Sequence, residues 1–284
     1  MKTNTNSSVE SQLIDADERL ATVFSHFYCV RLPSQAPALP QQLLPNYEMV
    51  LAFNFGPAIP IQLGDAAHVV QQTAVLGPLR KILRYELPPG ADLMVVNFTL
   101  DGFYRLLGKP MRHINAADWR TADVLADHPY FRDLWQQLWT MTGQADRLRH
   151  IRDHVLANLS PSEDAARSLQ DSIPHFRSAT LDPVKAVAQA HHISPRLVQT
   201  RFRTYVGYSA KEMIRFLRFK DVLHSLCQQN PARVDWQALV LEFAYHDQSH
   251  LIKDFQYFVG CTPRRFLRQL AEGGVCISKT GRFY

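Results

Sequence analysis

Residues 236–261 read WQALVLEFAYHDQSHLIKDFQYFVGC, and residues 184–208 read VKAVAQAHHISPRLVQTRFRTYVGY. In each stretch a short apolar-periodic helix leads through a tight turn to a capping residue and a second helix that closes on glycine. Equivalent positions are separated by 53 residues throughout: Ser194 and Asp247, Val198 and Leu251, Phe202 and Phe255, Gly207 and Gly260. The sequence therefore predicts two helix-turn-helix units in tandem.

The second helix of each unit, the reading helix, is the part that such a motif places in the major groove of DNA. Ser194 and Asp247 are expected to cap these helices by accepting backbone N–H groups, and Pro195 suits the first helical position. The outward side chains are donors and acceptors able to contact bases or phosphates: Arg196, Gln199, Thr200 and Arg203 in the first unit, and Gln248, Ser249, His250 and Lys253 in the second. A solvated helix face explains any one of them, but it explains the eight together poorly.

Between the units, residues 209–226 (SAKEMIRFLRFKDVLHSL) carry apolar residues at helical spacing. They predict one long amphipathic helix that holds the two reading helices at a fixed separation. Lys211 is predicted to contact phosphate. Arg218 has two interpretations, a contact with DNA or an internal ion pair that fixes the two units against each other.

Three segments, ISPRLVQTRFRTYVGYS, RFLRF and above all AYHDQSHLIKDFQYFVGCTPRRF, resemble the DNA-binding region of the AraC/XylS family of bacterial transcriptional regulators. LLPNYEMVLAFNFG, VLGP and VVNFTLDGFYRLLG resemble more loosely the cupin-like sensor domain of one branch of that family. The resemblance implies base-reading roles for Arg196, Gln199, Thr200, Gln248, Ser249, His250 and Lys253, and phosphate-binding or capping roles for Ser194, Asp247, Thr262 and Arg264. Arg203 is predicted to contact phosphate from its place on the first reading helix.

Some residues depart from the family pattern in the turns. His192 and Ala244 stand where the family has glycine, and Val240 stands where it has alanine. A residue other than glycine at a left-handed position costs roughly 1 kcal/mol or rearranges the turn.

From Phe24 to about Pro110, short apolar runs alternate with turns rich in Pro and Gly. The runs of strand length are Tyr47–Phe55, Ala58–Leu63, Thr73–Leu76, Ile82–Leu87 and Leu93–Leu100. They predict an antiparallel β domain, a sandwich or a small barrel, of the kind that often binds a small ligand. The polar residues inside or beside these runs either line a ligand pocket or cap turns and close bulges: Asn46, Glu48, Asn54 and Asn97.

Two apolar stripes follow at helical spacing, one through Leu134, Trp135, Leu138 and Trp139 and one through Leu148, Ile151, Val155 and Leu159. They predict helices that pack either on the β domain or on a second copy of the chain. Residues 160–163 (SPSE) signal the start of a further helix. The predicted fold is thus α+β and multidomain: a flexible arm (1–16), a β-rich sensor or dimerisation domain (17–115), connecting helices (116–172), an AraC-type DNA-binding domain (173–271) and a tail (272–284).

Charge is distributed unevenly along the chain. Residues 171–284 contain 16 Lys and Arg against 9 Asp and Glu, a balance of +7, whereas residues 1–170 contain 15 against 17, a balance of −2. This asymmetry favours a polyanionic partner for the C-terminal part. The four cysteines lie far apart without a CxxC pair, a pattern untypical of zinc sites or disulfide frameworks. The N-terminus lacks the order of a secretory signal and no long apolar run occurs, so a cytoplasmic protein without a membrane span is expected.

The sequence does not predict an enzyme. It contains no His-x-His, HExxH, GxSxG, P-loop or GxGxxG motif; the β region offers His68, with His26 and His113 outside the predicted strands. No catalytic residue, cofactor or metal is therefore predicted. The predicted function is transcriptional regulation through sequence-specific binding of double-stranded promoter DNA, with a small-molecule effector acting through the β domain. The alternative is a regulator without such a ligand, controlled by abundance or a protein partner. RNA polymerase, for an activator, and a second copy of the chain are further expected partners.

Overall fold

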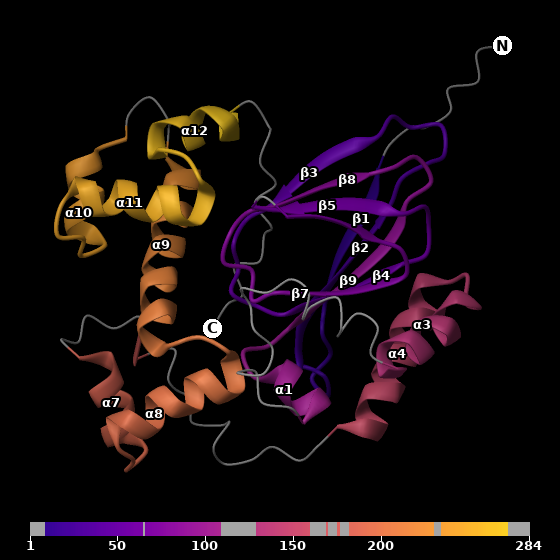
Figure 1. Cartoon of the computed structure of the whole chain (residues 1–284), viewed down its shortest axis with the longest axis horizontal. Coiled ribbons are helices and arrows are strands. Elements are labelled where there is room, and N and C mark those ends of the chain that lie inside the picture. Colours follow the sequence, from indigo (N-terminus) through magenta and orange to yellow (C-terminus); the bar gives the residue numbers. More distant parts are fainter. Residues whose placement is uncertain are drawn as a thin grey trace.

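The structure, a computed structural model, describes residues 9–64, 66–108, 129–159, 169, 175–176, 182–229 and 234–271. In these residues a β domain with attached helices lies beside a helical domain (Figure 1). The β domain comprises β1 (Glu10–Asp15), β2 (Phe24–Arg31), β3 (Leu39–Leu43), β4 (Val50–Asn54), β5 (Ile59–Leu63), β6 (Ala66–Val70), β7 (Thr73–Leu76), β8 (Leu83–Leu87), β9 (Asp92–Phe98), α1 (Gly102–Leu107), α3 (Pro129–Trp139) and α4 (Gln144–Asn158). The helical domain comprises α7 (Pro183–Ala190), α8 (Pro195–Arg201), η2 (Phe202–Val206), α9 (Ala210–Gln228), α10 (Trp236–Glu242), α11 (Gln248–Val259) and α12 (Pro263–Ala271). None of these helices has both the length and the apolar character needed to cross a bilayer.

The strands form two antiparallel sheets that pack face to face as a sandwich, one of the two predicted β architectures. The first sheet has the order β1-β2-β9-β4-β7, and the second has the order β3-β8-β5-β6. In β4 every residue is buried, because Val50 and Ala52 face the core between the sheets while Leu51 and Phe53 face the opposite side. In β5 buried and exposed residues alternate, as in a sheet with one solvated face.

Helices α3 and α4 cover the outer face of the first sheet. Leu134, Leu138, Ile151 and Val155 are buried in one cluster with side chains from that face. The Trp135 indole N–H donates to the carbonyl oxygen of Asn54 at 2.8 Å, which fixes α3 against β4. The two predicted stripes thus pack on the β domain of the same chain, except that Trp139 at the end of α3 is 53% exposed.

Four strands were not predicted: β1, β2, β3 and β6. The prediction of a flexible arm over residues 1–16 is wrong for Glu10–Asp15, which pair with His26–Arg31 as an edge strand. The pairing is long-range, and polar residues such as Ser11 and Gln12 gave no sign of it. His26 lies within β2 and not outside the strands. Residues 1–8, His113, residues 160–163 and the tail at 272–284 lie outside the described residues.

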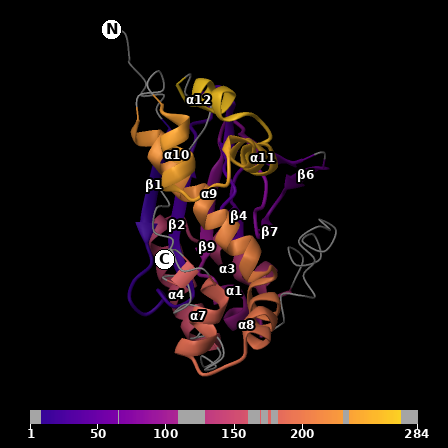
Figure 2. The same ribbon diagram turned by 90° about the vertical axis from the view of Figure 1, so that its left-hand side faces the viewer.

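The helical domain is built around α9, as the sequence predicted. Helices α7 and α8 lie at one end of α9 and α10–α12 at the other, in both views (Figures 1 and 2). All seven predicted apolar residues of α9 are buried: Met213, Phe216, Leu217, Phe219, Val222, Leu223 and Leu226. The equivalent pairs Val198 and Leu251, and Phe202 and Phe255, are also buried, which confirms the internal repeat.

The two domains share an aromatic contact at the start of β4. Tyr47 of the β domain belongs to the core of the helical domain, where its ring stacks on Phe216 with centroids 4.3 Å apart. The Tyr208 hydroxyl donates to the carbonyl oxygen of Tyr47 at 3.1 Å. Arg80 donates to the carbonyl oxygen of Gly207 at 3.2 Å and forms an ion pair with Glu212 at 3.3 Å. The first helix-turn-helix unit therefore ends against the β domain.

Candidate nucleic-acid interface and cavity

The first reading helix consists of α8 and its continuation η2. Ser194 Oγ accepts the backbone N–H of Leu197 at 3.2 Å, so Ser194 is the predicted N-cap, with Pro195 following it. Gly207 ends the helix at φ 83°, a left-handed conformation that glycine adopts without strain. The predicted contact residues all lie on its exposed face: Arg196, Gln199, Thr200 and Arg203. The Thr200 hydroxyl donates to the carbonyl oxygen of Arg196 at 3.0 Å, which orients its methyl group and lone pairs.

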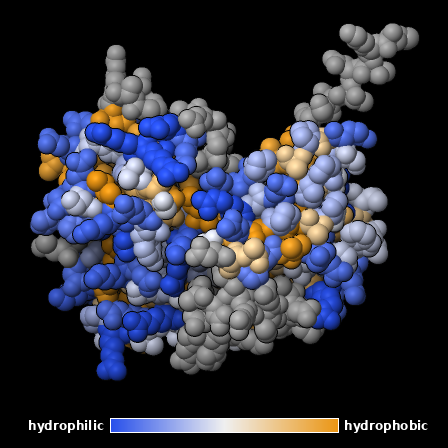
Figure 3. Space-filling view, turned by 45° about the horizontal axis from the view of Figure 1, so that its top comes forward, coloured by the Kyte–Doolittle hydropathy of each residue, from blue (hydrophilic) through white to orange (hydrophobic). Residues whose placement is uncertain are grey.

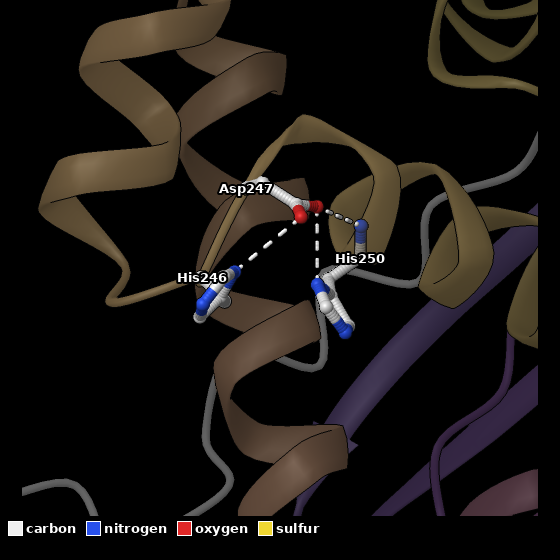
Figure 4. A group of neighbouring side chains, drawn as sticks. All are labelled: His246, Asp247 and His250. Carbon is white, nitrogen blue, oxygen red and sulfur yellow. Dashed lines mark hydrogen bonds and ion pairs between the residues drawn. The ribbon is translucent and has the colours of Figure 1, made fainter.

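The second reading helix is α11, and Asp247 is its N-cap. The Asp247 carboxylate accepts the backbone N–H of His250 at 2.9 Å (Figure 4). This backbone hydrogen bond lowers the pKa of Asp247 to about 2, aided by the side chains of His246 and His250. Gln248, Ser249, His250 and Lys253 are exposed, as predicted.

Three potential metal ligands meet at this cap. The possible ligand atoms of His246, Asp247 and His250 all lie within 4.8 Å of one another. Among the residues that the structure describes, this is the one group of three or more such ligands. The imidazole Nδ1 atoms of His250 and His246 lie 3.0 and 3.4 Å from the Asp247 carboxylate. That carboxylate accepts the backbone N–H of His250, so the group caps α11.

The remaining predicted residues lie around the two reading helices. Lys211 at the start of α9, and Thr262 and Arg264 at the start of α12, are exposed. In the face shown in Figure 3, strongly hydrophilic residues gather largely over the helical domain. Lys211, Thr262 and Arg264 are thus accessible from solvent.

An internal polar contact joins α9 to the second unit. Arg215 Nε donates to Asp254 Oδ1 at 2.7 Å, and the Tyr245 hydroxyl donates to Asp254 Oδ2 at 3.0 Å. Arg218 donates to the carbonyl oxygen of Ala244 at 3.3 Å and lies over the Tyr245 ring. Of the two interpretations of Arg218, the internal one is supported, although its partner is a carbonyl and the ion pair belongs to Arg215.

In both helix-turn-helix units, the turn contains a residue other than glycine in the left-handed conformation. His192 has φ 52° and Ala244 has φ 51°, so the turns are retained with strain and are not rearranged. We expect Ala244→Gly, and likewise His192→Gly, to raise the free energy of unfolding by about 1 kcal/mol. Denaturant titration measures this free energy of unfolding. Ala238→Gly is the matched control: Ala238 lies in the right-handed helix α10, where glycine is expected to lower the stability by about 1 kcal/mol. If glycine lowered the free energy of unfolding equally at positions 244 and 238, the backbone at Ala244 would not be strained.

The β sandwich encloses a cavity of about 370 Å³ between its sheets. Its lining comprises Ser11, Leu13, His26, Tyr28, Gln42, Leu43, Val50, Ala52, Ile59, Ile61, Val70, Leu76, Leu83, Tyr85, Leu93, Val95 and Asn97. Of the four predicted ligand candidates, Asn97 alone lines it. Asn46 accepts the backbone N–H of Glu48 in a turn, and the Asn54 amide donates to carbonyl oxygens of the neighbouring loops. Those two asparagines therefore close turns.

Glu48 lies at the boundary between the domains. It is 3% exposed, and neither carboxylate oxygen has a hydrogen-bond partner among the described residues. Burial raises the pKa of Glu48 well above its usual value, while the positive charge of Lys220 in α9 acts in the opposite direction. The carboxyl group thus contributes to the domain boundary and not to the cavity wall.

His26, which sequence reasoning did not propose as a site residue, lines the cavity from β2. Burial lowers the pKa of His26 from 6.5 to about 4, assisted by Lys220 and opposed by Asp15. Its Nδ1 lies 2.9 Å from the Ser25 hydroxyl. The imidazole is therefore neutral at physiological pH.

This lowered pKa makes stability depend on pH. Below pH 6.5 the unfolded chain takes up a proton that folded His26 does not, so stability is lost as the pH falls toward 4. Between pH 7 and 5 we expect His26 to contribute a loss of about 2 kcal/mol. Denaturant titrations of wild type and His26→Gln at both pH values isolate this contribution, because the other titratable groups are common to both proteins and cancel in the difference. A constant difference between the two proteins would contradict the prediction.

Comparison with known proteins bears on the helical domain. A family described as a helix-turn-helix domain, HTH_18, matches residues 187–269. None of the curated proteins matches the chain significantly in sequence. ToxT from Vibrio cholerae is 8% identical, with a TM-score of 0.40 over 92% of this chain and 98% of its own. ToxT bound to (E)-4-(8-methylnaphthalen-1-yl)but-3-enoic acid is 9% identical, with a TM-score of 0.41 over 93% and 99%.

The AraC-like transcriptional activator CuxR is 14% identical, with a TM-score of 0.29 over 74% of this chain and 86% of its own. TM-scores this low do not establish a shared fold, so the assignment rests on residues 187–269 and the two capped units within them. The C-terminal domain of this chain is therefore a DNA-binding helix-turn-helix domain, of the AraC type that the sequence predicted.

Proposed function

We propose that the two reading helices enter successive major-groove segments of one promoter site. The observation that carries this proposal is that α9 joins two capped helices whose exposed faces are both rich in donors and acceptors. The 19 residues of α9 correspond to a length of about 28 Å, close to one turn of B-DNA. Both helices can then face the same side of the duplex.

Within this arrangement we assign two kinds of contact. Residues in the first two turns of each reading helix read base edges, and those at the margins bind phosphate. The proposed base-reading residues are Arg196, Gln199, Thr200, Gln248, Ser249, His250 and Lys253. The proposed phosphate-contacting residues are Arg203, Lys211, Thr262 and Arg264, with Ser194 and Asp247 as caps.

Alanine substitutions distinguish these roles. Arg196→Ala and Gln248→Ala should each weaken binding to a cognate site by about 1–3 kcal/mol and relax discrimination at one position. Lys211→Ala should weaken binding to all sequences similarly and reduce the salt dependence. Fluorescence anisotropy with selected genomic fragments and scrambled duplexes measures both effects. An equal loss on every sequence for Arg196→Ala and Gln248→Ala would remove their base-reading role.

We further propose that an effector in the sandwich cavity controls DNA binding. Val50 and Ala52 of β4 line the cavity, and Tyr47, just before β4, lies in the core of the helical domain. An effector that favours one position of β4 would thus favour one placement of the helical domain. The rival proposal, control by abundance or a protein partner, predicts a DNA affinity that no small molecule changes. Screening the full chain on its DNA site against a metabolite library separates the two.

A second copy of the chain and RNA polymerase are also proposed partners. The exposed Trp139 at the end of α3 offers an apolar contact on the β-domain side. Sedimentation of the free protein and of its DNA complex measures the stoichiometry, and transcription with purified RNA polymerase shows whether the protein activates or represses.

A further inference from the structure

The cavity in the β sandwich carries information about the chemical class of its ligand. Most of its wall is made of aliphatic side chains contributed by both sheets, among them Ala52, Ile61 and Leu83. Such a wall favours an apolar ligand, because burying apolar surface contributes roughly 25 cal/mol per Å² to the free energy of binding. The volume of about 370 Å³ suits a small metabolite and not a polymer.

Polar side chains line the cavity from both sheets, and two of them lie side by side in the first sheet. His26 and Asn97 are direct cross-strand partners of β2 and β9, and Asn97 pairs in turn with Val50 of β4. All three residues line the cavity. Asn97 offers both a donor and an acceptor, and the His26 imidazole offers one or the other according to its tautomer. A single hydroxyl, carbonyl or amide group of a ligand can be satisfied in this row.

Full charges are missing from the lining. None of the lining side chains in the described part of the chain is Lys, Arg, Asp or Glu. The charged groups that act on His26 from neighbouring elements are Asp15 and Lys220, and neither lines the cavity. A carboxylate or ammonium group placed here would lose its hydration without a partner of opposite charge, which costs several kcal/mol.

Building on the proposed effector control, we infer that the effector is an uncharged, largely apolar small molecule with a hydrogen-bonding group at one end. Its polar end meets His26 and Asn97, and its apolar body fills the space between the sheets. The polar end lies in the row of Val50, three residues from Tyr47, so this class of ligand acts on the strand that leads to the helical domain.

A matched probe series tests the class. Isothermal titration calorimetry of the full chain with n-octanol, octanoate and octylammonium varies only the head group. We expect n-octanol to bind at least 10-fold more tightly than either ion, since leaving one charge unpaired costs more than 1.4 kcal/mol. Ala52→Phe should abolish octanol binding by filling the cavity, whereas Ala67→Phe on the exposed face of β6 should leave it unchanged.

The polar end has its own test. Asn97→Leu should weaken octanol binding while leaving toluene, which has no polar group, bound equally or more tightly. Tighter binding of octanoate or octylammonium than of octanol, still lost in Ala52→Phe, overturns the inferred class but leaves effector control standing. Failure of all four probes to bind overturns the cavity as a ligand site, and with it the proposed effector control.

Discussion

Replacing Tyr47 with alanine is expected to separate the two domains, at a cost of about 3–4 kcal/mol to their association. Tyr47 comes from the β domain, yet its ring is 4% exposed among side chains of the helical domain. It stacks on Phe216 at 4.3 Å and meets Tyr208 edge to face at 4.9 Å. Alanine removes the ring and leaves a cavity at the boundary.

The backbone at this position supports the same conclusion. Tyr47 has φ 55°, a left-handed conformation that costs a residue with a side chain roughly 1–2 kcal/mol. The aromatic contacts and the hydrogen bond from the Tyr208 hydroxyl offset this strain. Without the ring, the strain remains and most of the compensation is lost.

Thermal unfolding followed by near-UV and far-UV signals measures the effect. We expect the Tyr47→Ala protein to unfold in two transitions and its DNA affinity to stop responding to ligands of the cavity. Leu241→Ala is the control, because Leu241 lies on α10 of the helical domain, is 81% exposed and does not line the cavity. A Tyr47→Ala protein that unfolds as wild type does would show that the boundary is held by other contacts, such as the Arg80–Glu212 ion pair.

The helical domain was predictable because its signals are local. Caps at Ser194 and Asp247, closing glycines and a 3.6-residue apolar period all act within one or two helical turns. Each such signal has a fixed physical meaning, and the equivalent positions in the two units confirm one another. The residues of α9 predicted to be buried are buried for the same reason.

The β domain was predictable only where a strand is apolar along its whole length. In β4 both faces are buried, which produces the visible run of apolar residues. In β1 the strand exists because Glu10–Asp15 pair with β2, and this long-range pairing leaves no local pattern in a polar segment. The edge strands β3 and β6 are likewise set by their neighbours.

Ligand-site residues could not be identified from the sequence, because burial alone does not tell a lining residue from a turn-closing one. Asn54 and Asn97 both follow apolar residues, yet the Asn54 amide meets loop carbonyls and Asn97 faces the cavity. His26 was missed because β2 itself was missed. Which face of a strand looks into the cavity depends on the register of β2, β9 and β4, a property of the assembled sheet.

The second large effect is expected for Asp254→Ala, which should lower the stability of the helical domain by about 3 kcal/mol. Asp254 is 5% exposed and accepts hydrogen bonds from Arg215 of α9 and from the Tyr245 hydroxyl. Its loss leaves a buried hydroxyl without an acceptor and a guanidinium without its counterion. The Arg215 side chain is 38% exposed, so water recovers part of the lost interaction and the expected cost stays near the lower end for such pairs.

The same substitution should also weaken DNA binding, since Asp254 ties the second reading helix to α9 and thereby to the first unit. Asp254→Asn keeps the shape of the side chain and an acceptor for Tyr245 but removes the charge. We therefore expect an intermediate loss of stability, which measures the contribution of the ion pair with Arg215. Glu242→Ala, at an exposed position of α10, controls for removal of a carboxylate from the same domain. Denaturant titration and DNA binding are measured on all three. If Asp254→Asn proved as stable as wild type while Asp254→Ala did not, the hydrogen bond to Tyr245, and not the ion pair with Arg215, would hold the second reading helix in place.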